Sequence, residues 1–447
     1  MTCPIEDYGL IGDGETAALV SRNGSIDWLC WPRFDSDACC AALLGNDQHG
    51  FWRIAPAFAG WRSTRRYRTD TLVLETEFTR GGNTVRLIDF MPMRKGPPTL
   101  LRIVEGLRGQ VPLRLELMLR FDYGLITPWL EPRGDVVCAI VGPDQVAFRS
   151  PVPVQSAAGK LSADFTVSAG QRLGFALAWG PSKEPPPSPV DPDAALAPTE
   201  GYWREWVARF RVHTPWRDPV VRSLITLKAL IHAPTGGLVA APTTSLPEVI
   251  GGEANWDYRF CWLRDATFTV GALLNAGYHD EAVGWRDWML RAIAGSPDRL
   301  RIMYRVDGGR HVPEWTVSWL PGYAGSRPVR VGNGAAGQEQ IDVHGELIEA
   351  MHLLDRAGIP RPEHGLALER DLVLRLENVW TDPGHGLWEN RGEPQHYVYS
   401  KVMAWVGIDR FVRGTDAQTD ADREIVRRLA GLRQAIHKEI CEKGYSS

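Results

Sequence analysis

The pattern of hydrophobic and polar positions divides the chain into a β-rich part and a helical part. Up to about residue 180, short segments alternate apolar and polar residues, and turns rich in Gly, Asn or Asp separate them. This period of two predicts half-buried strands, and many short strands at regular spacing indicate an antiparallel β-sandwich. The predicted strands are residues 15–20, 25–31, 71–78, 84–90, 100–107, 112–120, 136–141 and 165–179.

A proline-rich stretch separates the two parts. We interpret residues 181–198 as a linker, with an ordered surface loop as the alternative. Beyond it, apolar residues recur every three or four positions, for example at Leu368, Leu372 and Leu376, which predicts helices. The predicted helices are 200–212, 219–232, 266–276, 280–294, 338–356, 362–380, 397–412 and 419–443. The expected domains are therefore 1–180 (β), 181–198 (linker) and 199–447 (helical).

Composition narrows the class of protein. The net charge of the 447-residue chain is −4 and no long basic run occurs, so we expect no nucleic-acid partner. No apolar stretch is long enough to span a membrane, and the start lacks the pattern of a signal peptide. The seven cysteines lack CxxC spacing, which argues against a disulfide framework or a zinc site and favours the cytoplasm. The oligomeric state stays open.

The stretch 251–265, GGEANWDYRFCWLRD, combines acidic, basic and aromatic residues just before a predicted helix. Hydroxyl groups of a sugar take hydrogen bonds from Arg and carboxylate, and the C–H face of the sugar rests on an aromatic ring. The stretch is thus suited to the floor of a sugar site. The alternative is a buried ion-pair cluster that caps the helix, and composition does not choose between the two.

Two further loops hold candidate chemistry, and long loops between helices usually carry function. Residues 322–340 present Arg327 and Arg330 on a Gly-rich loop whose spacing differs from the phosphate-binding pattern. In residues 382–401, Glu389 follows Trp388 directly, and a carboxyl that an indole desolvates suits a general acid. The alternative is that Glu389 merely pairs with Arg391. Whether the helices close into a toroid or form a solenoid is not decided by the pattern.

Three segments together resemble glycoside hydrolase family 15, which contains glucoamylases, glucodextranases and a bacterial branch of α,α-trehalases. They are GEANWDYRFCWLRDA, GSRPVRVGNGAAGQEQIDVHGEL and GLWENRGEPQHYVYSKVMAWVGIDR. The N-terminal EDYGLIGDGETAALVSRNGSIDWLCWPRFDS resembles the β-domain that precedes the barrel in bacterial members. The resemblance covers most of the chain. It implies a β-sandwich followed by an (α/α)6 barrel, and inverting hydrolysis of terminal α-glucosidic bonds.

The resemblance also implies roles for individual residues. Glu389 matches the family's general acid, and its choice over Glu253, Glu314 or Glu346 rests on this match. Arg264 and Asp265 match the pair that holds the far hydroxyls of the non-reducing glucose. The other expected substrate-binding residues, taken from their place in or beside the matching motifs, are Trp262, Trp256, Tyr258, Arg259, Arg327 and Trp388, with Trp31, Arg33 and Asp35 in a loop of the β-domain.

One part of the family pattern is missing. The general base of the family lies late in the barrel, and no match to it occurs before Ser447. An inverting glycosidase needs two carboxyls about 6.5–9.5 Å apart. We therefore expect the front portion of such an enzyme, with an incomplete barrel.

The expected substrate is trehalose or the end of an α-glucan, with α,α-trehalase activity ahead of glucoamylase activity because of the N-terminal domain. A sugar-binding remnant without turnover is the alternative from another class. A phosphorylase, for which the basic loop Arg327–Arg330 would bind phosphate, is a third hypothesis. No organic cofactor is required, and no metal-ligating cluster stands out in the sequence.

Overall fold

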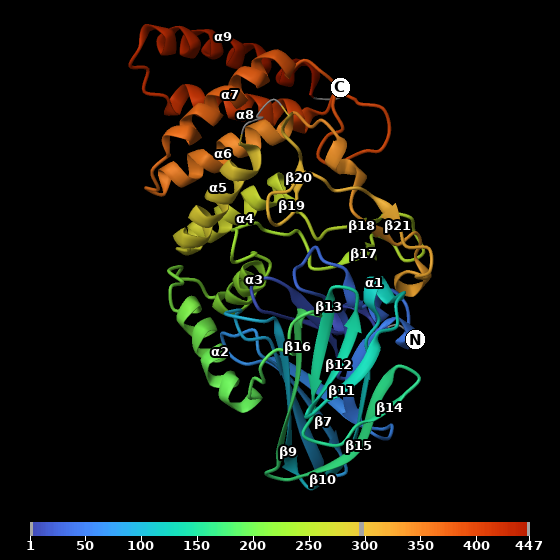
Figure 1. Cartoon of the computed structure of the whole chain (residues 1–447). Helices are drawn as coiled ribbons and strands as arrows, with labels where there is room; N and C mark the ends of the chain where they lie inside the picture. The colour runs from blue at the N-terminus through green and yellow to red at the C-terminus, as the bar shows by residue number, and fades with distance from the viewer. Residues whose placement is uncertain (1–2, 295–298, 445–447) are drawn as a thin grey trace. The chain divides into compact units, whose positions relative to one another are not determined.

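A computed structural model describes residues 3–294 and 299–444 (Figure 1). The chain divides into two compact units. The first comprises Met1–Ala233, Ala241–Arg259 and Trp315–Val331, and the second comprises Pro234–Ala240, Phe260–Glu314 and Gly332–Ser447.

The first unit contains two antiparallel sheets of eight strands each. Along the first sheet the strand order is β1 (Tyr8–Gly12), β2 (Ala17–Ser21), β3 (Ser25–Cys30), β5 (Phe51–Pro56), β10 (Gln110–Met118), β15 (Lys160–Ser168) and β14 (Gln155–Ala157), with β4 (Ala38–Cys40) paired to β3. Along the second it is β11 (Trp129–Arg133), β12 (Val136–Val141), β13 (Asp144–Arg149), β16 (Arg172–Pro181), β9 (Thr99–Arg108), β8 (Asn83–Phe90), β7 (Leu74–Arg80) and β6 (Arg62–Tyr67). The predicted antiparallel β-domain is confirmed.

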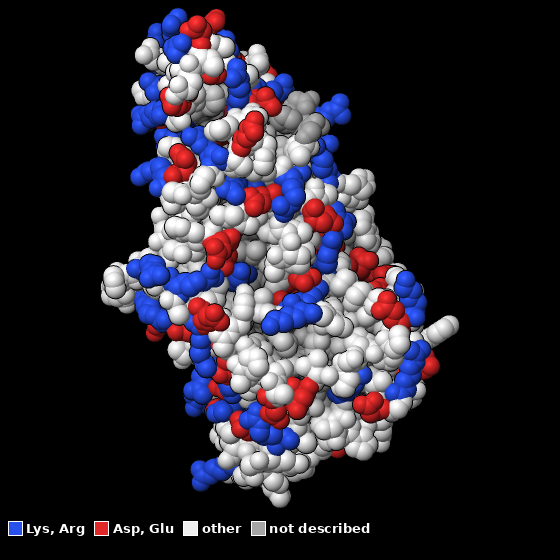
Figure 2. Space-filling view, turned by 60° about the vertical axis from the view of Figure 1, so that its left-hand side comes forward, with Lys and Arg blue, Asp and Glu red and all other residues white. Residues whose placement is uncertain are grey.

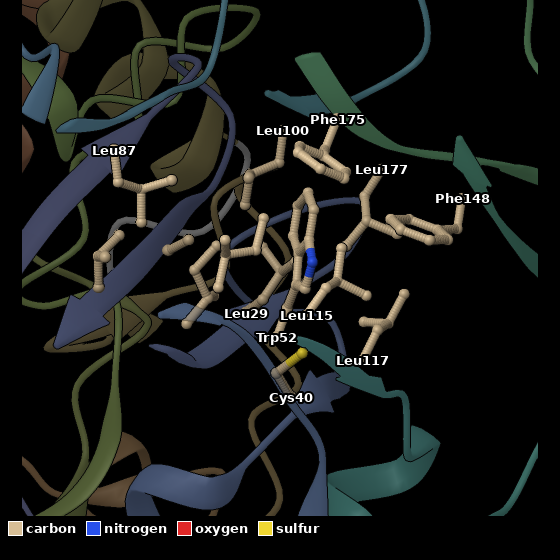
Figure 3. Packing of buried hydrophobic residues seen from close by; sticks show 14 of the residues in the cluster. Leu29, Cys40, Trp52, Leu87, Leu100, Leu115, Leu117, Phe148, Phe175 and Leu177 are labelled. Atoms are coloured by element: carbon tan, nitrogen blue, oxygen red, sulfur yellow. The ribbon is translucent and has the colours of Figure 1, made fainter. Parts of the chain in front are cut away.

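The two sheets share one hydrophobic core, as expected for a sandwich (Figure 3). Trp52 of β5 meets Phe148 of β13 edge-on, with the ring centroids 5.8 Å apart. Arg102 of β9 is fully buried beside them and donates to Asp89 at 2.7 Å. It also donates to the carbonyl oxygens of Trp52 and Gly24, so one guanidinium bonds to both sheets.

Several details of the β part differ from the prediction. Residues 165–179 form parts of two strands, because a turn at Gly170, whose φ is +84°, separates β15 from β16. Strand β6, RSTRRY, was not predicted, since its alternate residues are exposed and it has almost no apolar side chains to mark a face.

Helices α2 (Pro192–Val207) and α3 (Arg217–Ala229) complete the first unit. Leu196 of α2 packs on Ile88 and Leu101 of the second sheet. The predicted linker therefore ends earlier than expected, because the helix begins inside it. Asp191 caps α2 by accepting a hydrogen bond from the backbone N–H of Asp193, and Pro192 occupies the first helical position.

The second unit is built from helices α4 (Leu263–Ala276), α5 (His279–Ile293), α6 (Asp342–Arg356), α7 (Glu363–Val379), α8 (Val398–Gly414) and α9 (Asp420–Lys443). Helix α6 packs between α4 and α8 (Figure 1). Helix α5 packs on α4 and α6, helix α7 packs on α6 and α8, and helix α9 packs on α8. Each predicted helix of this unit is present within a few residues. The two short strands β19 (Cys261–Trp262) and β20 (Met303–Tyr304) pair with each other.

The surface is mixed in charge, in keeping with the small net charge. Figure 2 shows acidic and basic side chains interspersed over the face in view. Among residues 3–294 and 299–444, no helix is both long and apolar enough to cross a membrane.

The sandwich core gives a first prediction. Phe148 is 2% exposed whereas Phe58 is 66% exposed. Phe148→Ala opens a cavity against Trp52 and is expected to lower the free energy of unfolding by about 3–5 kcal/mol. Phe58→Ala, the matched control, is expected to change it by less than about 0.5 kcal/mol. Urea unfolding of the three proteins measures both values, and equal effects would contradict the assignment of the core.

Candidate active site

The stretch 251–265 divides at the boundary between the two units. In its first half, strand β18 (Asn255–Asp257) leads into Arg259, and Asp257 and Arg259 are both fully buried. Their side chains form an ion pair with Nη2 and Oδ2 2.7 Å apart. Arg259 also donates to the hydroxyl oxygen of Tyr123 at 2.9 Å and to the carbonyl oxygen of Ser36 at 2.7 Å. The buried ion-pair interpretation therefore holds for this half, and Arg259 does not line a site as expected.

Trp256, Tyr258 and Arg327 also belong to the first unit. The guanidinium of Arg330 lies over the ring of Trp256, 4.4 Å from its centroid, so one face of this indole is covered. Arg327 is exposed and Tyr258 is half-buried. Their expected role in binding substrate stays a prediction.

The expected residues of the β-domain loop are in the first unit as well. Trp31 is buried in the core of the sandwich rather than presented to a ligand. Arg33 and Asp35 form an ion pair at 2.9 Å in which the carboxylate is fully buried. Trp31 and Asp35 thus have structural contacts, while the side chain of Arg33 is 26% exposed and its expected approach to the sugar site stays a prediction.

In the second unit the structure brings four of the predicted residues together. Trp262 occupies the residue position just before α4, and Arg264 and Asp265 occupy the first turn of this helix. Oε1 of Glu389 accepts two hydrogen bonds, from Nε1 of Trp262 at 2.6 Å and from Nη1 of Arg264 at 3.3 Å. Nη2 of Arg264 lies 3.1 Å from Oδ2 of Asp265. The guanidinium thus bridges the two carboxyls.

Glu389 has the electrostatics of a proton donor. Its side chain is 19% exposed. Burial raises the pKa of this carboxyl, and the opposing effects of Arg264 and of the Trp262 hydrogen bond do not cancel the rise. Since both hydrogen bonds are accepted by Oε1, a protonated Glu389 carries its proton on Oε2. A single oxygen is therefore left to deliver the proton.

The loop that carries Glu389 is held from several sides. Nη1 of Arg264 donates to the carbonyl oxygen of Leu387 at 2.8 Å. Nε2 of Gln338 donates to the carbonyl oxygens of Glu389 at 3.2 Å and Asn390 at 3.1 Å. The backbone of Glu389 has a φ of +54°, a left-handed conformation that residues other than glycine rarely adopt. Such strain is often found at functional positions, where surrounding contacts hold it.

Two sequence arguments about Glu389 need correction. Its neighbour Trp388 is 82% exposed, so the indole that contacts the carboxyl is Trp262 and not the adjacent one. Arg391 forms its ion pair with Glu314, at 2.9 Å, so the simple pairing of Glu389 with Arg391 is not the arrangement found. The exposed Trp388 remains a prediction as a sugar-binding residue.

The sequence argument missed a buried polar cluster in the same unit. Asp342 and Glu346 lie one turn apart on α6 and are buried, and Oε1 of Glu346 accepts a hydrogen bond from the hydroxyl of Tyr399 at 2.9 Å. The sequence could have indicated this cluster, because Asp342 and Glu346 fall on the helix face that also carries the buried Val343 and Leu347. A charged pair on an apolar face is rarely a solvated surface pair.

In the described part of the chain, no group of three or more His, Cys, Asp or Glu side chains has the arrangement to hold an ion.

Comparison with known proteins follows the two parts of the chain. Residues 215–447 match the model of the glycosyl hydrolases family 15, and residues 1–167 match the trehalase-like N-terminal domain. The chain belongs to glycosyl hydrolase family 15. The family match includes the whole stretch from Trp262 to Glu389, so the contacts among Trp262, Arg264, Asp265 and Glu389 lie in the glycosidase part.

The relatives of this family-15 chain include proteins named as trehalases. The trehalase of Thermoplasma volcanium is 32% identical over 99% of this chain and 71% of its own length. The trehalase of Mycobacterium tuberculosis is 32% identical over 99% of this chain and 69% of its own. A bacterial glucoamylase solved with acarbose has a TM-score of 0.69 at 13% identity, and the match covers 98% of this chain and 67% of that one. This last similarity shows a glucoamylase-like fold.

The buried ion pair gives a second prediction. Asp257→Asn leaves the charge of Arg259 buried and unpaired, which is expected to cost about 3–5 kcal/mol of stability. The control is Asp164→Asn, which breaks an exposed pair with Arg114 and is expected to leave stability close to that of the wild type. Urea unfolding measures both. A small effect of Asp257→Asn would mean that solvent reaches Arg259.

The contact between Trp262 and Glu389 gives a third prediction. Trp262→Phe removes the donor while keeping most of the apolar volume. Since this hydrogen bond lowers the pKa of Glu389, its loss is expected to raise that pKa further. The ionisation of Glu389 is measured from the carboxyl carbon resonances of carbon-13-labelled glutamate, assigned by comparison with Glu389→Gln. An unchanged or lowered pKa would contradict the contact.

Proposed function

We propose that the chain acts on trehalose and cleaves its α-glucosidic bond with inversion, with Glu389 as the general acid. The observation that carries this proposal is the carboxyl of Glu389, which has a raised pKa and is bound on Oε1 by Trp262 and Arg264. The trehalase relatives and the trehalase-like N-terminal domain support trehalose as the substrate.

In this mechanism the glucose unit to be attacked is held by Arg264 and Asp265. Oε2 of Glu389 gives its proton to the glycosidic oxygen as the C1–O bond breaks and the ring takes on oxocarbenium character. Water attacks C1 from the opposite face and loses a proton to a base. The attacked unit leaves as β-glucose, while the leaving unit of trehalose is released as α-glucose.

The sugar-binding remnant is the second candidate, and the carboxyls near Glu389 favour it. Asp265 is paired with Arg264, and burial raises the pKa values of Asp342 and Glu346. A paired or protonated carboxyl is a poor general base at neutral pH. Glu346, with a pKa of about 8, is mostly protonated at neutral pH, and Asp265 is engaged by Arg264, so neither is suited to act as the base. This candidate predicts sugar binding without turnover.

The cytoplasm is the proposed compartment. The seven cysteines are thiols rather than disulfides, and five of them, for example Cys39 and Cys40, are buried. Free thiols are typical of a reducing environment.

Glucose release from trehalose and from maltotriose tests the proposal. Release from trehalose is expected, and Glu389→Gln is expected to lower the rate by about 10²–10⁴-fold because general acid catalysis is lost. Glu393→Gln is the matched control, since Glu393 is exposed on the same loop. The anomers formed first, followed by NMR, are expected to be α- and β-glucose in equal amounts.

Other outcomes select other functions. Release from maltotriose alone would indicate the glucoamylase activity. Two α-glucose molecules from trehalose would exclude inversion. Binding of trehalose by calorimetry without glucose release would establish the remnant. Glucose 1-phosphate formed only when phosphate is added would indicate a phosphorylase.

A further inference from the structure

Two carboxyls on α6 are buried without full hydrogen bonding. Asp342 is 0% exposed and Glu346 is 2% exposed. Oε1 of Glu346 accepts from Tyr399 of α8 at 2.9 Å. Oε2 of Glu346 accepts no hydrogen bond from the residues that the structure describes. The carboxyl of Asp342 has no side-chain partner among them, and only the backbone N–H groups of Asp342 and Val343 lie at hand. An ionised carboxylate in such a place would be strongly destabilised, so a proton is the simplest way to neutralise it.

The charges around these carboxyls lead to the same conclusion. Glu346 faces Asp342 on its own helix, Tyr399 on α8, and Arg264 and Asp265 on α4. Arg264 is the cation of this group, and it already contacts Asp265 at 3.1 Å and Glu389 at 3.3 Å. One guanidinium cannot balance four ionised carboxyls, of which Asp342 and Glu346 are buried while the side chain of Asp265 is 38% exposed.

We propose that Glu346, supported by Asp342 and Tyr399, is a positioning residue for the Arg264–Glu389 pair, and that it acts in its protonated form. As a neutral acid it exerts no net attraction on the guanidinium of Arg264, the cation whose charge acts on this carboxyl. If Glu346 loses its proton, it becomes a buried anion that competes with Glu389 and Asp265 for the same cation. The inference rests on the proposed function, in which Arg264 holds the sugar.

The proton on Glu346 can be measured without any sugar. Burial raises the pKa of Glu346 from 4.5 to about 8, so its stabilising contribution is present below about pH 4.5 and is lost as the pH rises to about 8. Between pH 5 and pH 9, wild type is expected to lose more of its resistance to urea than Glu346→Gln, whose amide cannot ionise. Glu349→Gln is the matched control, because Glu349 is on the same helix but pairs with Arg410. Parallel losses in wild type and Glu346→Gln would overturn the proposal.

Positioning is measured by the affinity for trehalose in calorimetry. At pH 6 the Kd of Glu346→Gln is expected to match that of wild type within about threefold, since both side chains are neutral. At pH 9 wild type is expected to bind about tenfold more weakly, because one unit above a pKa of about 8 only about a tenth of the carboxyl stays protonated. Glu346→Gln is expected to keep its affinity. An equal alkaline loss in both proteins would overturn the positioning role.

Tyr399→Phe provides a second test, which does not depend on the folding of Glu346→Gln. The hydroxyl of Tyr399 lowers the pKa of Glu346, so its removal is expected to move the alkaline loss of affinity to higher pH. A shift to lower pH, or none, would contradict the proposal. Absence of trehalose binding in every protein at every pH would refute the sugar site together with the positioning role, whereas the urea measurement would still report the proton on Glu346.

Discussion

The hydrogen bonds to Oε1 of Glu389 are the contact on which the candidate chemistry depends. They come from the first residues of α4 and meet a loop that follows α7, so two distant parts of the sequence are joined at one atom. The same guanidinium binds the loop backbone at Leu387. A change at Arg264 would therefore alter the charge, the position and the backbone of the proposed acid together, which makes it difficult to separate binding from catalysis at this residue.

Buried ionisable side chains are stabilised in two ways in this chain. In the first unit, Arg102 with Asp89 and Arg259 with Asp257 are fully buried and paired, and the remaining guanidinium donors bond to oxygen atoms of the surrounding strands and loops. In the second unit, Glu346 is buried with one hydrogen bond and a raised pKa. Pairing fixes a structure, whereas a protonated acid leaves the neighbouring cation free to bind other groups.

The sequence predicted the helices of the second unit well because their apolar periodicity is strong. It placed Glu389 on a loop as found, but it expected Arg264 and Asp265 in the loop before the helix, whereas they occupy the first turn of α4. The sequence-based prediction was wrong where the role of a residue depends on partners that are distant in the sequence. The WDYR half of the 251–265 stretch shares Trp, Asp and Arg with the WLRD half, yet Asp257 and Arg259 form a fully buried ion pair. The indole beside Glu389 in sequence is exposed, and the one beside it in space is Trp262. The buried pair on α6 was visible only as two carboxyls on an apolar face.

The division of the chain into units has a consequence for how the protein is made. The chain passes from one unit to the other after residues 233, 240, 259, 314 and 331. Strand β22 (Arg330–Val331), which pairs with β21 (Trp315–Thr316), is the last segment of the first unit, and a ribosome adds it only after α4 and α5 have been synthesised. The first unit therefore cannot finish folding before part of the second has emerged, and neither unit can be excised or exchanged between relatives as one continuous cassette.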